Sequence, residues 1–300
     1  PWERDLIHSI TGKEADVNST KTNSVREVVA TTPGVPATDG DGVRMTRVIG
    51  SQELNMLDPF LLLDAFESDQ PQDYIGGFPS HPHRGFETVT YLLAGRMRHK
   101  DNAGNEGVIE PGGVQWMTAG KGIVHSEMPE QENGLLMGFQ LWVNLPARAK
   151  MSEPGYQEYP PSQTPLEKRE DGTEIRVIAG ITSEGTEGIV RNEHVRPTYL
   201  DVTLPAGRVF EQRVDAADNA FIFVIEGELD AGERRTAIGR RNLGILSEGD
   251  LVHVTTAQGA RFLLVSAMPL GEPVARGGPF VMNTKEEIIQ AFDDYRHNRF

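Results

Sequence analysis

Residues 76–95 read GGFPSHPHRGFETVTYLLAG, a stretch in which glycine and proline surround two histidines and an apolar run follows. His81 and His83 are two positions apart, and side chains at i and i+2 of a β-strand point to the same face. The same spacing returns at His125 and Glu127 in the sequence IVHSEMP. Two strands that carry these pairs would offer three imidazoles and one carboxylate to a single divalent ion. Because the chain has no cysteine, this set is typical of a catalytic or redox metal and not of a thiolate-rich structural zinc site.

Glu87 is separated from His81 and His83 by an even number of residues, so strand parity allows it to face the same ion. It can serve as a further ligand, or as an acceptor that orients a metal-bound imidazole, which is a common role of carboxylates beside metal sites. Parity alone does not separate these two roles.

The composition favours many short strands. The chain has 300 residues, enough for two domains, and its 32 glycines and 19 prolines favour turns over long helices. Short apolar or alternating runs occur at 44–48, 59–63, 87–93, 107–109, 114–117, 135–143, 175–179, 199–204, 220–225, 250–255 and 261–267. We therefore predict an all-β fold, either an antiparallel sandwich or a barrel.

Two halves of the chain follow one plan, in which a strand and a glycine turn lead to a second glycine turn. The first example runs from residues 91–95 to 110–113 and the second from 223–227 to 247–250. Prolines at 154, 160, 161 and 165 exclude a central strand between the halves. The predicted boundaries are an extension over 1–24, a metal-binding domain over 25–150, a linker over 151–172, a second domain over 173–282 and a C-terminal helix over 283–300.

The C-terminal helix is predicted from its own signals. Thr284 followed by Glu287 forms a capping box, and Ile288, Phe292 and Tyr295 recur at helical spacing. We expect this amphipathic helix to cover a sheet.

The formal net charge of −15 disfavours direct binding to nucleic acids or anionic membranes. Residues 1–24 lack the apolar core of a signal peptide, and no apolar run has the length of a membrane span. We expect a cytoplasmic protein, with the nucleus as the alternative in a eukaryote. The local cluster Arg234, Arg235, Arg240 and Arg241 is interpreted as solvation of a hairpin, with docking of an acidic partner as the alternative.

Several other side chains have two interpretations. Phe78 and Trp116 can line a pocket or fill the barrel core, whereas Trp142 is expected in the core. Lys121 can steer an anionic substrate or lie in solvent. His99 is expected to cap a turn or to bond Asp101, and not to be a fifth ligand.

Five blocks of the sequence resemble the signature of the pirin family. They are residues 57–62 (LDPFLL), 76–89 (GGFPSHPHRGFETV), 115–129 (QWMTAGKGIVHSEMP), 140–145 (QLWVNL) and 278–284 (GPFVMNT). The resemblance extends from about residue 25 onward, although residues 173–277 match weakly.

The resemblance implies a bicupin, with two jelly-roll barrels packed face to face and one metal in the first barrel. It implies that His81, His83, His125 and Glu127 are the ligands and that Glu87 is not. In the second barrel the equivalent positions hold Glu211, Arg213 and His253, and Arg213 would repel a cation.

The resemblance also implies two alternative functions. One is a quercetin 2,3-dioxygenase that uses iron(II) and dioxygen to open a flavonol or a similar aromatic small molecule, with Glu127 as both ligand and proton acceptor. The other is a non-enzymatic, redox-sensing iron protein that binds a transcriptional regulator or a metabolic enzyme. Manganese, cobalt, nickel, copper and zinc accept the same ligands.

Overall fold

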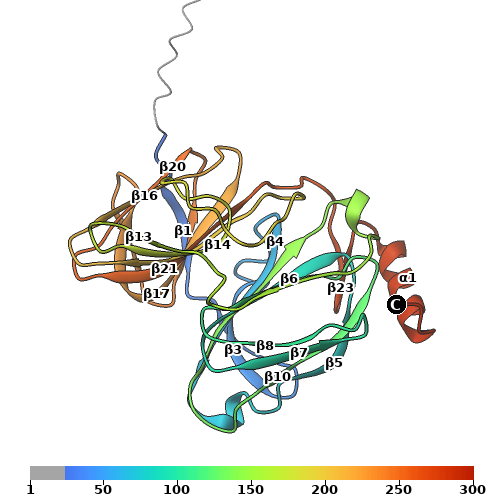
Figure 1. The fold of residues 1–300 in the computed structure, drawn as a ribbon. Coiled ribbons are helices and arrows are strands. Elements are labelled where there is room, and N and C mark those ends of the chain that lie inside the picture. The colour runs from blue at the N-terminus through green and yellow to red at the C-terminus, as the bar shows by residue number, and fades with distance from the viewer. Residues whose placement is uncertain (1–23) are drawn as a thin grey trace, which may run out of the picture.

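The computed structural model describes residues 24–300, so the predicted extension over 1–24 lies almost entirely outside the described residues. The described chain forms two antiparallel β-barrels and one C-terminal α-helix (Figure 1), which confirms the predicted fold class. Within residues 24–300, no helix has both the length and the apolar character needed to cross a bilayer.

The first barrel is built from two sheets. A seven-stranded sheet has the order β12-β9-β6-β11-β4-β3-β2, and a four-stranded sheet has the order β5-β10-β7-β8. The strands are β2 (Val35–Asp39), β3 (Val43–Ile49), β4 (Phe60–Ser68), β5 (Phe78–His83), β6 (Phe86–Ala94), β7 (Met97–Asp101), β8 (Glu106–Ile109), β9 (Val114–Thr118), β10 (Ile123–Pro129), β11 (Leu136–Asn144) and β12 (Gly155–Tyr159).

The second barrel contains a ten-stranded sheet whose main path is β1-β19-β17-β21-β15-β14-β13. Its strands are β1 (Val28–Thr32), β13 (Leu166–Lys168), β14 (Glu174–Ala179), β15 (Thr198–Leu204), β16 (Val209–Arg213), β17 (Asn219–Ala231), β18 (Thr236–Gly239), β19 (Leu243–Leu246), β20 (Leu251–Thr255) and β21 (Ala260–Ala267). Apolar side chains from these strands, including Phe210 and Phe262, fill its interior.

The two domains share a core, because the outer face of the seven-stranded sheet packs on the second domain. Phe60 meets Phe221 at 5.2 Å between ring centroids, and Phe139 meets Phe223 at 5.4 Å. This apolar contact gives the face-to-face arrangement that the family resemblance implied.

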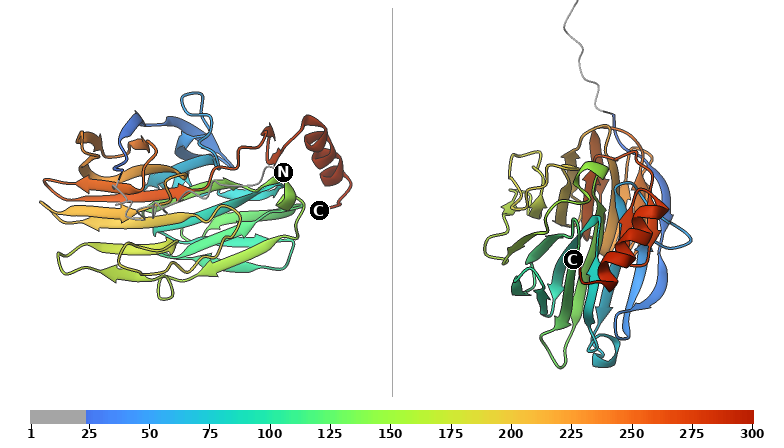
Figure 2. Two further views of the ribbon diagram at one scale, coloured as in Figure 1. Left: turned by 90° about the horizontal axis from the view of Figure 1, so that it is seen from above. Right: turned by 90° about the vertical axis from the view of Figure 1, so that its right-hand side faces the viewer.

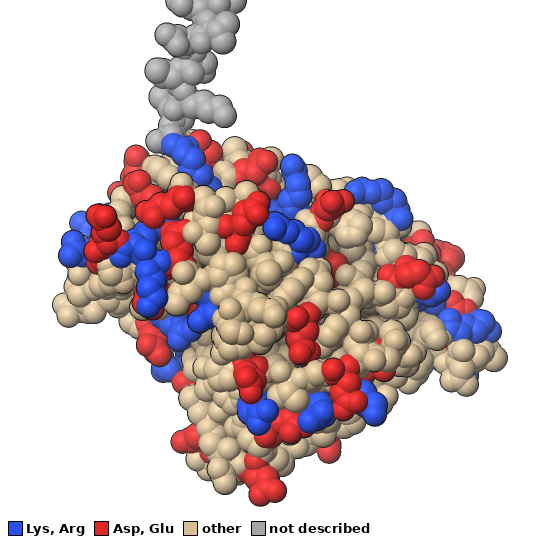
Figure 3. Space-filling view, in the orientation of Figure 1, with Lys and Arg blue, Asp and Glu red and all other residues tan. Residues whose placement is uncertain are grey.

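Charged side chains also join the domains. Arg240 and Arg241 both bind the Glu67 carboxylate of β4, so two members of the predicted solvation cluster have a different role. Acidic and basic side chains are interspersed on the face drawn in Figure 3.

The observed domain boundaries differ from the predicted ones, because both ends of the chain cross to the other domain. Strand β1 lies in the first predicted domain but pairs with β19 of the second. At the other end, β22 (Ala275–Gly277), β23 (Phe280–Met282) and α1 (Lys285–Arg296) lie against the first barrel (Figure 2). The predicted linker over 151–172 supplies β12 to one sheet and β13 to the other, both as edge strands, where proline is tolerated.

The C-terminal segment is held to the first barrel by buried polar contacts. The Lys150 ammonium donates to the carbonyl oxygens of Gly85 and Val281, at 2.8 and 3.0 Å, and to Asn144. Arg84, which directly follows His83, forms an ion pair with Asp294 of α1 at 2.8 Å.

Helix α1 begins as predicted. Thr284 Oγ1 accepts a hydrogen bond from the Glu287 amide, and the Glu287 carboxylate accepts one from the Thr284 amide. The helix covers the small β22–β23 sheet, with Phe292 edge-on to Phe280.

Candidate metal centre

The two same-face pairs lie on neighbouring strands of the four-stranded sheet. In the antiparallel register of β10 and β5, His125 is directly opposite His81. The ring centroids of His81 and His125 are 4.4 Å apart, and those of His83 and His125 are 5.0 Å apart. One potential ligand atom from each of the three histidines can be chosen so that all lie within 4.8 Å of one another. Hydrogen-bonded neighbouring strands therefore bring these imidazoles together.

Each imidazole is fixed through its Nδ1 atom. His81 Nδ1 lies 2.7 Å from the Pro79 carbonyl oxygen, and His83 Nδ1 lies 3.3 Å from that of Pro279. Because a carbonyl oxygen can only accept, Nδ1 carries the hydrogen in both rings and Nε2 keeps its lone pair.

His125 supplies the clearest indication of a cation site. Its Nε2 atom is buried and has no hydrogen-bond partner among residues 24–300. An unpaired buried nitrogen is costly, and a coordinated metal would satisfy it. The residues present therefore fit a divalent metal.

The protonation states agree with metal binding. Burial, reinforced by the neighbouring His81, lowers the pKa of His83 to about 3. Burial and the surrounding imidazoles also lower the pKa of His125 well below its ordinary value. Both side chains are neutral at physiological pH, which is the form that binds metals.

Glu127 lines the same cavity, but its carboxylate lies outside the compact histidine group. Gln140 Nε2 donates to Glu127 Oε2 at 2.9 Å, and Thr90 Oγ1 lies 2.7 Å from Oε1. Each carboxylate oxygen keeps a further lone pair for another partner. The assignment of Glu127 as fourth ligand stays a prediction.

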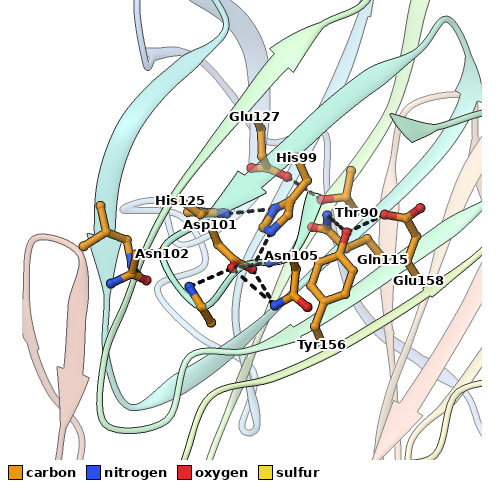
Figure 4. A network of polar contacts seen from close by, with 12 residues as sticks. Thr90, His99, Asp101, Asn102, Asn105, Gln115, His125, Glu127, Tyr156 and Glu158 are labelled. Atoms are coloured by element: carbon orange, nitrogen blue, oxygen red, sulfur yellow. Dashed lines mark hydrogen bonds and ion pairs between the residues drawn. The ribbon is translucent and has the colours of Figure 1, made fainter. Parts of the chain in front are cut away.

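His99 and Asp101 lie on β7, which pairs with β10 on the side opposite β5, and the His99 ring is next to that of His125 (Figure 4). His99 Nε2 is 2.8 Å from Asp101 Oδ2, which is the contact expected from the sequence. His99 Nδ1 is 3.4 Å from His125 Nδ1, a contact that the sequence did not suggest.

A cavity of about 770 Å³ opens beside His81, His83 and Glu127. Its apolar wall includes Met45, Leu62, Phe66, Phe78, Met97 and Trp142, and its charged wall includes Arg47, Asp64 and Arg276. Arg276, Gly278 and Pro279 come from the C-terminal segment, so the second half of the chain completes the cavity of the first domain.

The aromatic predictions have mixed outcomes. Phe78 lines the cavity, as one of its two interpretations required. Trp142 was expected in the core but is half-buried in the cavity wall, with its ring 5.2 Å from that of His83. Trp116 lies in the core shared by the two domains and does not line this cavity.

Glu87 and Lys121 also lie away from the cavity. The chain reverses at Gly85, where φ is +90°, so parity does not carry from β5 to β6. Glu87 consequently faces the second domain and accepts hydrogen bonds from Thr118 at 2.7 Å and Asn192 at 2.5 Å. Lys121 forms a solvent-facing ion pair with Glu153 at 2.6 Å.

In the second barrel, His253 Nδ1 bonds Glu211 at 3.0 Å, and both side chains are partly or largely exposed. Arg213 forms an ion pair with Asp250. These contacts lie apart from the apolar interior of that barrel.

Two cupin-type barrels with a histidine cluster in the first define a metal-binding bicupin. The family model described as Pirin matches residues 42–143, and the one described as Pirin C-terminal cupin domain matches residues 199–300. A Caulobacter vibrioides protein named "Pirin-like protein" is 54% identical over 276 residues, which cover 92% of this chain and 99% of that protein. The chain belongs to the pirin family.

Two further relatives carry the name of an activity. A Pseudomonas aeruginosa protein named "Putative quercetin 2,3-dioxygenase" is 49% identical over 275 residues, covering 90% of this chain and 96% of its own length. The crystal structure of quercetin 2,3-dioxygenase from Acinetobacter baumannii has a TM-score of 0.84 and 33% identity, covering 92% of this chain and 99% of that one.

The buried Glu87 predicts a pH dependence of stability. Burial raises the pKa of Glu87 from 4.5 to about 7, although hydrogen bonds from Thr118 and Asn192 oppose this shift. Because the folded pKa is the higher one, the stabilising contribution is complete below pH 4.5 and is lost as the pH rises through 7. Glu87→Gln should therefore lose about 2–3 kcal/mol less stability than the parent between pH 5 and 8.

Urea denaturation of the metal-free protein at several pH values measures this difference. Glu132→Gln, at an exposed position, is the matched control and should keep the parental pH slope. If Glu87→Gln kept the parental dependence of stability on pH, the raised pKa of Glu87 would be contradicted.

Proposed function

We propose that this chain is a metal-dependent dioxygenase of the quercetin 2,3-dioxygenase type, with a flavonol or a similar aromatic small molecule as substrate. The observation that carries the proposal is the cluster of His81, His83 and His125, which adjoins a cavity of about 770 Å³ with aromatic side chains in its wall. Cavities of this size typically enclose small organic molecules. The names of the two relatives described above support the same activity.

His81, His83 and His125 would hold the metal, with Glu127 as the proposed fourth ligand. We propose iron(II) as the native ion, and manganese, cobalt, nickel, copper and zinc accept the same donors. When bound, such an ion supplies Lewis-acid activation of a hydroxyl group and a redox centre for dioxygen chemistry.

The protein's own groups position the substrate and move its proton. Phe78 and Trp142 offer aromatic surfaces for a flat ring system. The Glu127 carboxylate faces the cavity and can accept the proton of the flavonol hydroxyl. The reaction consumes one flavonol and one dioxygen and releases a ring-opened ester and one carbon monoxide, so it requires no external reductant.

Loss of the metal should abolish flavonol turnover. The full chain, stripped of metal and reloaded anaerobically with iron(II), is exposed to air and quercetin while flavonol absorbance and oxygen uptake are recorded. His125→Ala removes one imidazole and should reduce turnover at least 100-fold. His253→Ala is the matched control, because His253 contacts Glu211 in the second barrel and should leave turnover unchanged.

The enzymatic proposal fails if flavonol loss does not depend on the metal or if His125→Ala matches the parent. The redox-sensing regulator would then be the function to test, by recovery of a protein partner with only one oxidation state of the iron-loaded chain.

Arg276 should contribute to the binding of an ionised flavonol. Its guanidinium donates to the Leu61 carbonyl oxygen at 3.0 Å and lies 5.9 Å from the Trp142 ring centroid. Among the described residues, no carboxylate forms an ion pair with Arg276, so its charge is available to an anionic oxygen of the substrate. Arg276→Met keeps the packing on Trp142 and removes the charge.

We expect Arg276→Met to raise KM for quercetin about tenfold, which corresponds to about 1.4 kcal/mol, with little change in kcat. Arg299→Met is the control, because Arg299 pairs with Asp293 and Asp294 near the chain end. An unchanged KM would show that Arg276 does not contact the substrate.

A further inference from the structure

His99 is a fully buried imidazole that the proposed chemistry does not use. It lies between the metal-site histidine His125 and the Asp101 carboxylate (Figure 4). His99 Nε2 is 2.8 Å from Asp101 Oδ2, and His99 Nδ1 is 3.4 Å from His125 Nδ1. The three side chains form a continuous chain of polar contacts.

The direction of the hydrogen bonds among these three side chains follows from the Asp101 carboxylate. Asp101 accepts from the backbone amides of Ala103 and Asn105, at 2.9 and 3.0 Å, and from the Asn105 side chain. Burial raises its pKa, but the hydrogen bonds from His99 and Asn105 outweigh burial and leave the pKa of Asp101 below its ordinary value. An ionised carboxylate can only accept, so the hydrogen in this contact belongs to His99 Nε2.

When the His99 ring is neutral it carries one ring hydrogen, and the contact with Asp101 then leaves His99 Nδ1 as an acceptor. The neighbouring Nδ1 of His125 must therefore carry a hydrogen and donate it. This leaves His125 Nε2 with a lone pair, and that atom is the buried nitrogen without a partner.

We propose that His99 and Asp101 are positioning residues that fix the metal-binding tautomer of His125. The other two imidazoles do not need such a device, because backbone carbonyls of Pro79 and Pro279 fix them. A backbone carbonyl oxygen only accepts hydrogen bonds and is retained when a side chain is substituted, whereas the His99 side chain can be replaced by one with different donors and acceptors. The His125 tautomer is therefore the one that a single substitution can change.

Packing keeps the His99 ring in place. The Tyr156 ring of β12 packs against it, tilted by 34° and with 4.8 Å between ring centroids. The Tyr156 hydroxyl contacts Gln115 and Glu158 and takes no part in the polar contacts among His125, His99 and Asp101. Tyr156→Phe therefore keeps the ring that packs on His99 and leaves the polar contacts among His125, His99 and Asp101 intact.

The test is cobalt(II) binding by the otherwise intact metal-free chain, measured with cobalt alone against a competing chelator. In Asp101→Asn the new amide can donate to His99 Nε2, which moves the His99 hydrogen to Nδ1 and the His125 hydrogen to Nε2. We expect cobalt affinity to fall about 10–100-fold. His99→Leu, which removes both hydrogen bonds, should cause a similar loss.

Two variants separate positioning from packing. In His99→Gln the amide can donate to Asp101 while its oxygen accepts from His125, so cobalt affinity should stay within about threefold of the parent. Tyr156→Phe should also bind cobalt like the parent. A purely structural role of His99 predicts instead that His99→Gln and His99→Leu lose affinity equally.

A spectroscopic measurement tests the tautomer without any variant. Long-range ¹H–¹⁵N spectra of the histidine-labelled, metal-free parent should show His125 with its hydrogen on Nδ1, and Asp101→Asn should show it on Nε2. The proposal is overturned if the parent already carries the hydrogen on Nε2, or if Asp101→Asn binds cobalt like the parent. Because neither readout involves a flavonol, the result is independent of the proposed enzymatic activity.

Discussion

The hydrogen-bond register of β10 with β5 and β7 is the constraint on which the metal centre depends. This register places His125 opposite His81 on one side and opposite Asp101 on the other. A slip of one residue would turn the His125 side chain to the opposite face of the sheet. The register also buries His83 and His125, and burial lowers the pKa of both, so the same pairing sets the position and the charge of these two side chains.

A second constraint comes from the C-terminal segment, which crosses from the second domain to the first. Pro279 orients His83, Arg276 lines the cavity, and Lys150 joins the Val281 and Gly85 carbonyls. The metal centre therefore depends on chain regions far apart in sequence. The second barrel, filled by its own apolar core, supports this segment and the shared interface.

The sequence predicted the parts of the site that rest on local periodicity. The spacing of His81 and His83 and of His125 and Glu127 identified the same-face pairs, and the His99–Asp101 bond followed from two residues on one strand. Glu87 was misplaced as a cavity candidate because the turn at Gly85 interrupts the alternation. Three features depend on tertiary pairing, which periodicity within one strand does not encode. They are the crossing of both ends of the polypeptide to the other domain, the contact of Pro279 with His83 and the contact of His99 with His125.

The central claim is that one divalent metal binds in the first barrel through the Nε2 atoms of His81, His83 and His125. Anomalous diffraction from crystals of the cobalt-loaded chain tests it most directly. The account predicts a single cobalt peak about 2.1 Å from each of the three Nε2 atoms, with a Glu127 oxygen as the further protein ligand. A peak elsewhere, or coordination through Nδ1 of any of these histidines, would contradict it.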